Sequence, residues 1–497
     1  MSSALLYQWL FLRLSRRFTL PFLLAAGALL GLAFPPLARR VVVALPPLPA
    51  ALAVLGLLAL ALLASLWTAT AAYRLAPPRP VAWFDPPDPT PPPAPAPRAN
   101  LLGRYRRIGL ILAGGGAKGA YQAGALAAVH GFLAERGALG SVRMIAGTSI
   151  GAWNACFWLA GMVSEDADSP LERWWSRLDL SEVVAPTFYL PAGRNYVLSA
   201  APWRQAFRSL FHDHPAARER LEAVMREPDA PGSLRFYLTR TNVERAHLEF
   251  STNRPDLVDL DNASGRRRPL EPPDRWTRAT SVEDLEQAVF ASMDLPPLFE
   301  YVQIGDETFE DGGVVDNLPI YFGTGIEKCD LLFVFPLNAS YASGVDRRRI
   351  LRRMQRVLTI RQGALERKAL KDVYLYNELA ALRGQTRGAR LEDVPILADT
   401  SPAGSDPALR EAASRSLVER AATRVHRPVQ IFAVCPDEPL GIDTMEFWKT
   451  EAAGRAYRLM REHTRYELER FDFEADPNWI RMALVGPRGE IRYVEDF

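Results

Sequence analysis

The chain has 497 residues, of which 48% are hydrophobic and 23% are charged, and its 59 Lys and Arg against 57 Asp and Glu leave a formal net charge of +2. This balance excludes a disordered chain, a collagen-like chain and a strongly basic nucleic-acid-binding protein, because each of these requires a biased composition. We therefore expect no nucleic-acid partner, and the length predicts two to four domains.

The first hundred residues differ from the rest, with eight Arg, no Lys and only two acidic residues. Residues 18–38 and 41–73 contain no charged side chain, and prolines at the start of the second stretch limit its span to about residues 50–70. A membrane-spanning helix needs about 20 apolar residues. We therefore predict a two-helix transmembrane hairpin over residues 1–76, and a membrane bilayer as a partner.

The arginines around these stretches indicate an orientation. Five flank the hairpin on its outer sides, whereas only Arg39 and Arg40 lie between the spans. Positive charges concentrate on the cytoplasmic side, so we predict an integral membrane protein whose large downstream portion faces the cytoplasm. The alternative is a cleaved signal peptide, but a second, longer apolar run follows and no small-x-small cleavage site precedes it.

A proline-rich segment follows the hairpin, with 11 prolines between residues 77 and 97. Such a segment forms an extended, semi-rigid spacer. We therefore predict a linker over residues 77–100, a folded domain over 101–345 and a mostly helical C-terminal extension over 346–497.

Apolar periodicity predicts an α/β domain after the linker, because strand, helix and strand follow each other from residue 108 at the spacing of a βαβ unit. The predicted strands cover residues 108–113, 142–146, 234–241, 246–252, 331–336 and 429–434. The predicted helices cover residues 117–134, 152–160, 347–382 and 444–471.

The sequence Gly147-Thr148-Ser149-Ile150-Gly151 lies between a predicted strand and a predicted helix. A serine in this G-x-S-x-G context sits on a tight elbow, with its hydroxyl held out of the chain near a helix N-terminus. We therefore predict Ser149 as a nucleophile, with Gly147 and Gly151 forming the elbow.

A glycine-rich loop, Gly114-Gly115-Gly116-Ala117-Lys118-Gly119, follows the first predicted strand. Its backbone N–H groups can converge on an anion or oxyanion. Nucleotide-cofactor binding is an alternative, but Glu135 does not end the second strand as a ribose-binding acid would, and no hydroxyl residue follows Lys118 as in a phosphate-binding loop. Lys118 itself could face a phosphate headgroup or be solvated.

Asp311-Gly312-Gly313 would by itself indicate only a turn. Taken in order, however, the glycine loop, the GTSIG elbow and this DGG motif resemble the patatin-like phospholipase family. The segment from Ala291 to Phe299 resembles the alanine-serine-x-x-x-proline segment of that family, and Asn317 with Pro319 fits the continuation after DGG. The resemblance covers about residues 107–338.

This resemblance implies a three-layer α/β sandwich with a mostly parallel central sheet. It implies that Ser149 is the nucleophile and Asp311 its general base, in a dyad without histidine. The glycine loop would supply the oxyanion hole, chiefly through the N–H groups of Gly115, Gly116 and Ala117.

The implied activity is that of a serine lipid acyl hydrolase, which cleaves carboxylic esters of phospholipids or related acyl lipids through an acyl-enzyme, and the predicted hairpin would anchor this enzyme in the membrane. It requires no cofactor and no metal. Two alternatives differ from it: a serine, acid and histidine triad with His426 or His463 as its histidine, and a non-catalytic membrane scaffold.

Overall fold

The computed structural model describes ten stretches of the chain, which are residues 101–178, 180–186, 198–230, 233–258, 275–296, 298–338, 350–386, 428–437, 440–475 and 481–494. The predicted hairpin, the linker and His426 lie outside the described residues. Within these stretches, no helix combines the length and hydropathy that crossing a bilayer requires.

Contacts between Cα atoms divide the chain into two compact units. Residues 1–85 and 342–359 form one, and residues 86–341 and 360–497 form the other. All described residues except 350–359 therefore belong to the second unit, which contains every predicted site residue.

The second unit contains one large sheet. Its strands are β1 (Ile108–Leu112), β2 (Val142–Gly147), β5 (Arg235–Asn242), β6 (His247–Thr252), β7 (Trp276–Arg278), β8 (Val302–Ile304), β9 (Glu307–Asp311), β10 (Leu331–Phe335), β11 (Gln430–Pro436), β12 (Arg481–Val485) and β13 (Ile491–Val494). Their order is β13-β12-β11-β10-β1-β2-β5-β6-β7, and β9 pairs with both β5 and β8. A separate pair consists of β3 (Ala185–Pro186) and β4 (Leu198–Ser199).

The central strands of this sheet, from β12 through β11, β10, β1 and β2 to β5, pair in parallel. The pairs β12 with β13, β5 with β6, and β9 with β5 and β8 are antiparallel. β1 and β10 are short, fully buried apolar runs, as expected for parallel strands covered on both faces. The predicted mostly parallel α/β sheet is thus confirmed.

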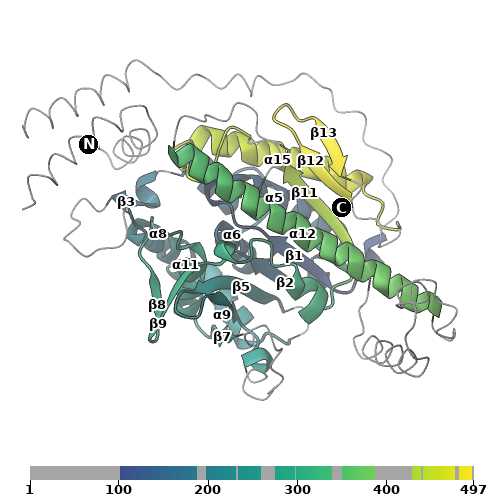
Figure 1. Ribbon diagram of the computed structural model, residues 1–497, viewed down its shortest axis with the longest axis horizontal. Helices are drawn as coiled ribbons and strands as arrows, with labels where there is room; N and C mark the ends of the chain where they lie inside the picture. The colour runs from purple at the N-terminus through teal and green to yellow at the C-terminus, as the bar shows by residue number, and fades with distance from the viewer. Residues whose placement is uncertain are drawn as a thin grey trace, which may run out of the picture. The chain divides into compact units, whose positions relative to one another are not determined.

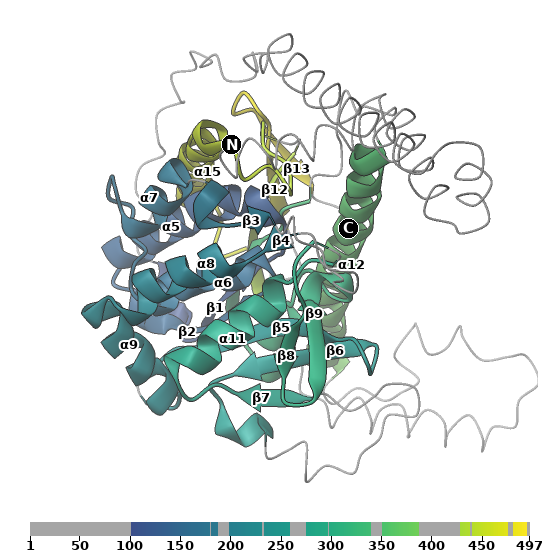
Figure 2. The ribbon, with the colours of Figure 1, turned by 90° about the vertical axis from the view of Figure 1, so that its left-hand side faces the viewer.

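Helices complete the layers. They are α5 (Gly119–Glu135), α6 (Ile150–Leu159), α7 (Pro170–Arg177), α8 (Ala201–Phe207), α9 (Pro215–Arg226), α11 (Val282–Met293), α12 (Ile350–Thr386) and α15 (Thr450–Arg470). Figure 1 and Figure 2 show α5, α6, α8 and α11 on one side of the sheet and residues 360–386 of α12 on the other, so the sheet lies between two helical layers.

The C-terminal part of the chain differs from its prediction as a mostly helical extension with one strand at residues 429–434. The structure places β11 there and adds β12 and β13 to the same sheet. β12 has only a short apolar run after Arg481, and β13 lies at the sheet edge, contains Arg492 and is not buried, so both give a weaker signal than the longer, fully buried β11. The sheet therefore continues across the predicted boundary at residue 346.

Parallel pairing brings the carboxyl ends of the central strands to one edge of the sheet. The glycine loop follows β1, the elbow follows β2 and Asn338 lies just after β10. Loops at the carboxyl ends of parallel strands are the usual place for a ligand in α/β folds, and the candidate site lies at this edge.

Candidate active site

Ser149 occupies the elbow between β2 and α6. Its φ of 55° and ψ of −124° are unusual for a residue with a side chain, and such conformations store strain where the surrounding structure holds them. Its N–H donates to Ser292 Oγ at 2.9 Å, and its side chain is partly exposed. The elbow therefore presents the Ser149 hydroxyl outside the sheet, as the sequence predicted.

The elbow requires close approach of α6 to the sheet. A Cβ added to Gly151 would lie 2.4 Å from Leu112 O, at the end of β1. Gly147 is the last residue of β2, and there too a Cβ would meet the first turn of α6. Any larger residue at position 151 would push the helix away from β1 and displace Ser149.

Asp311 ends β9 and lies beside Ser149. The Ser149 side chain lies close enough to its carboxyl group to lower the pKa of that group, and the Gly313 N–H donates to Oδ1 at 2.7 Å. Thr241 Oγ1 donates to the Asp311 carbonyl oxygen at 2.9 Å, which ties the end of β9 to β5. The structure thus brings together two side chains that are far apart in the sequence.

Burial controls the acidity of this carboxyl. Asp311 is only 4% exposed, and burial raises its pKa to about 6, helped by the charge of Glu310, while the Ser149 side chain and the hydrogen bond from the Gly313 N–H oppose the rise. A carboxylate with a pKa near 6 is ionised at neutral pH and is a stronger base than an ordinary aspartate.

The glycine loop lies against the nucleophile, since a Cβ added to Gly114 would lie 3.0 Å from Ser149 Cβ. Four of the six N–H groups in the loop already donate to backbone carbonyls. They are those of Gly114, Ala117, Lys118 and Gly119. The N–H groups of Gly115 and Gly116 enter no hydrogen bond with any residue that the structure describes.

Ala117 therefore differs from its expected role. Its N–H donates to Thr444 O at 2.8 Å, in the segment between β11 and α15. The same carbonyl explains why residue 116 is glycine: Gly116 has a φ of +59°, and a Cβ there would lie 2.1 Å from Thr444 O. The N–H groups of Gly115 and Gly116 therefore remain as the candidate donors of the oxyanion hole.

Lys118 is buried rather than solvated. It is 3% exposed, and its Nζ donates to Asn338 Oδ1 at 2.6 Å. Asn338 in turn contacts Glu366 of α12. The sequence offered no signal for Glu366, because a glutamate within a long charged helix usually faces solvent.

Histidine does not enter the site in the described part of the chain. His463 lies on α15 with its ring against Gly489, in the turn between β12 and β13. Among the described residues, Asp311 accepts hydrogen bonds from the Gly313 N–H and the Thr241 hydroxyl, and the side chain of Ser149 lies beside its carboxyl group. No group of three metal-ligating side chains occurs among the described residues.

A family model matches the part of the chain that contains most of this site. Residues 110–322 match the family model described as patatin-like phospholipase, and no curated protein matches the chain. Among solved structures, VipD from Legionella pneumophila is similar over 73% of this chain and 67% of its own, at 15% identity and a TM-score of 0.35. The type III effector protein ExoU is similar over 39% of each chain, at 15% identity and a TM-score of 0.18.

Proposed function

We propose that this protein is a serine acyl hydrolase that cleaves carboxylic ester bonds of phospholipids or related acyl lipids, because residues 110–322 match the family model described as patatin-like phospholipase. The observation that carries this proposal is that Ser149, on a strained elbow beside the glycine loop, lies next to the buried carboxyl of Asp311.

The proposed first step is acylation. Asp311 accepts the hydroxyl proton as Ser149 Oγ attacks the ester carbonyl, and the N–H groups of Gly115 and Gly116 donate to the oxyanion that forms. Collapse of the tetrahedral intermediate expels the alcohol, which takes the proton from Asp311.

Deacylation repeats these roles with water. Asp311 accepts a proton from the attacking water, the acyl carbonyl again becomes an oxyanion, and Ser149 leaves with the proton as the fatty acid is released. The loop should matter about as much as the base, because losing one oxyanion donor typically costs about 2.7–4 kcal/mol in the barrier.

The membrane part of the proposal rests on the sequence. Two charge-free stretches at residues 18–38 and 50–70 and the arginines around them support an anchored enzyme whose catalytic domain faces the cytoplasm. Such an anchor would hold the site beside acyl lipids.

Hydrolysis of defined phospholipids and fluorogenic acyl esters by the purified protein tests the mechanism. We expect Ser149→Ala and Asp311→Ala each to lower kcat by at least about 10³-fold, and His463→Ala to leave it unchanged. Loss of activity in His463→Ala with retention in Asp311→Ala would favour a histidine triad. A wild-type protein without hydrolytic activity would favour a scaffold.

A further inference from the structure

Glu366 is a buried acid on α12, and α12 begins after the segment that matches the family. It is 2% exposed, yet it faces three donors. Its Oε1 accepts from Asn317 Nδ2 and Asn338 Nδ2, each at 2.6 Å, and its Oε2 lies 3.3 Å from the Asn338 N–H. A buried carboxylate with this many partners has a defined orientation, because leaving any partner unpaired is costly.

The two asparagines connect this acid to opposite ends of the glycine loop. At one end, Asn317 Nδ2 also donates to Gly114 O at 3.0 Å, and the Gly114 N–H donates back to Asn317 O at 3.2 Å. At the other end, Asn338 Oδ1 accepts from Lys118 Nζ at 2.6 Å. Both anchors of the loop therefore meet at one carboxylate.

The loop between these anchors needs outside support. Gly115 and Gly116 have no side chains to hold them, and glycine has the largest backbone freedom of any residue. An oxyanion hole accelerates a reaction only if its donors are already in place when charge develops. A contact that fixes the loop at Gly114 and Lys118 can supply this order.

We propose that Glu366 is a positioning residue of the acyl hydrolase, which holds the Gly115 and Gly116 N–H groups in line with the developing oxyanion through Asn317, Asn338 and Lys118. The inference rests on the function proposed above. It extends the catalytic machinery into α12, beyond residues 110–322.

The charges around Glu366 agree with this role. Burial raises the pKa of Glu366 to about 7, while the Asn338 side chain, the charge of Lys118 and the Asn317 side chain act in the opposite direction. The same contacts that hold the loop therefore stabilise the ionised form of the acid.

Two substitutions of Glu366 remove its contacts to different extents. Glu366→Ala removes all three acceptor contacts, and we expect kcat to fall about 10²-fold, since a misplacement of about 1 Å at a reacting centre has an effect of that size. Glu366→Gln keeps one oxygen for the two asparagine amides but places an NH₂ group against the Asn338 N–H. We expect it to lower kcat about 10-fold. KM should change less than about 3-fold in both variants.

Asn377→Ala provides the matched control. Asn377 is equally buried on the same helix, and its side chain exchanges two hydrogen bonds of 2.9 Å with the backbone of Val429, before β11. Its loss should weaken the attachment of α12 without touching the glycine loop, so the variant should lose stability and keep its kcat per folded molecule.

Inhibitors then separate positioning from general destabilisation. A trifluoromethyl ketone acyl analogue forms an oxyanion on Ser149, so its inhibition constant should weaken in parallel with kcat in the Glu366 variants. A non-hydrolysable ether lipid forms no oxyanion and should bind all variants equally.

The inference is overturned if the kcat values of both Glu366 variants equal that of Asn377→Ala. It is also overturned if the Glu366 variants bind the ketone and the ether lipid more weakly by the same factor. If Glu366→Ala does not fold, Glu366→Gln decides alone by the same criteria. Hydrolysis that persists in Ser149→Ala instead overturns the proposed function, and with it the positioning role.

Discussion

At the scale of single residues, the environment of Asp311 makes its charge depend on pH within an accessible range. Its carboxyl must be ionised to accept the Ser149 proton, and its pKa is raised to about 6. We therefore expect kcat/KM for a neutral ester to rise with pH through about 6 and then level off. A profile measured between pH 4.5 and 8.5 tests this expectation.

Glu310 provides a control for that profile. Its charge contributes to the raised pKa of Asp311, so Glu310→Gln should move the inflection to lower pH while leaving the plateau unchanged. A wild-type profile that is flat through pH 6, or an inflection that Glu310→Gln does not move, would contradict Asp311 as the base.

Asp294 is a second buried acid at this edge, and its carbonyl oxygen accepts from the Asp311 N–H at 2.8 Å. It is 4% exposed. Burial, with the charges of Asp311 and Glu310, raises its pKa from 3.8 to about 8. The folded state therefore binds a proton that the unfolded state releases between these values, and stability falls as pH rises through this window.

Asp294→Asn should remove that loss, because asparagine keeps the shape of the protonated acid and does not titrate. We expect the free energy of unfolding of the variant to equal that of the wild type near pH 4. Between pH 4 and about pH 8, the free energy of unfolding of the variant should increasingly exceed that of the wild type, by at most about 1.4 kcal/mol per pH unit. Urea denaturation at several pH values measures the difference. If the free energies of unfolding of the two proteins differ by the same amount at every pH, the raised pKa of Asp294 is refuted.

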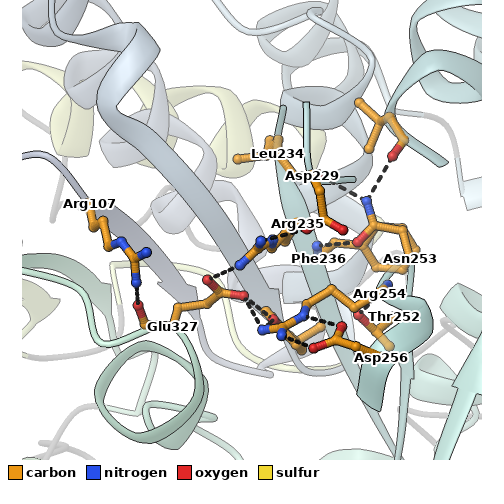
Figure 3. Close-up of polar contacts among 12 residues, drawn as sticks. Arg107, Asp229, Leu234, Arg235, Phe236, Thr252, Asn253, Arg254, Asp256 and Glu327 are labelled. Atoms are coloured by element: carbon orange, nitrogen blue, oxygen red, sulfur yellow. Dashed lines mark hydrogen bonds and ion pairs between the residues drawn. The ribbon is translucent and has the colours of Figure 1, made fainter. Parts of the chain in front are cut away.

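At the scale of elements, a polar cluster ties the strands together at the edge opposite the active site. Glu327 accepts from Arg235 at 2.7 Å and from Arg254 at 2.9 Å, and it also accepts from the Tyr237 hydroxyl. Figure 3 shows both guanidinium groups converging on its carboxylate, with Arg107 donating to the Glu327 carbonyl oxygen. The cluster thus joins the amino ends of β1 and β5 to the chain after β6.

Glu327→Gln should therefore lower stability and spare catalysis. Removing one partner of a buried ion pair costs about 3–5 kcal/mol. The guanidinium groups of Arg235 and Arg254 are 25% and 13% exposed, so we expect roughly 2–3 kcal/mol after allowing for solvent screening. Chemical denaturation measures the loss, and an unchanged kcat per folded molecule shows that it is structural. If Glu327→Gln also lowers kcat per folded molecule, the cluster around Glu327 is not independent of the active site at the opposite edge of the sheet.

The same elements show how far the sequence could predict this structure. The buried apolar runs of β1, β2 and β10 were predictable because strands covered on both faces leave little choice of residue. The elbow at Ser149 and the glycine loop were predictable because their backbone geometry restricts residue type. Asp311 was identified only from the order of three motifs.

Other parts of the site were not predictable, for physical reasons. Glu366 looks like any helical glutamate until the chain folds α12 against the carboxyl end of β10. The Ala117 N–H donates to the backbone carbonyl of Thr444. Every residue has such a carbonyl, so the sequence gives no signal for this contact. β13 owes its place to antiparallel pairing with β12 at the sheet edge rather than to an apolar run.

At the scale of the whole molecule, the folded unit that contains the candidate site extends past the segment that matches the family model. β10 and β11 lie after residue 322, yet β10 is the direct neighbour of β1 in the sheet. Thr444 and Glu366 both contact the glycine loop or its anchors. The described segments that contain Glu366 and Thr444 therefore support the site structurally.

The N-terminal hundred residues carry the last prediction, which concerns attachment to lipid. Arginine at the centre of a membrane span costs about 3 kcal/mol relative to leucine. Leu29→Arg combined with Leu60→Arg, near the centres of the two predicted spans, should therefore release the protein from membranes on carbonate extraction. The matched variant with isoleucine at both positions should stay in the membrane fraction.

Activity measurements complete this test. Hydrolysis of a short-chain ester in detergent should be equal in the two double variants, because the dyad and its loop lie within residues 101–497. Hydrolysis of phospholipid in vesicles should fall only in the arginine variant, since the anchor raises the local concentration of substrate at the site. If the arginine variant also stays in the membrane fraction on carbonate extraction, residues 18–38 and 50–70 are not membrane spans. The site must then reach its lipid through another surface of the protein.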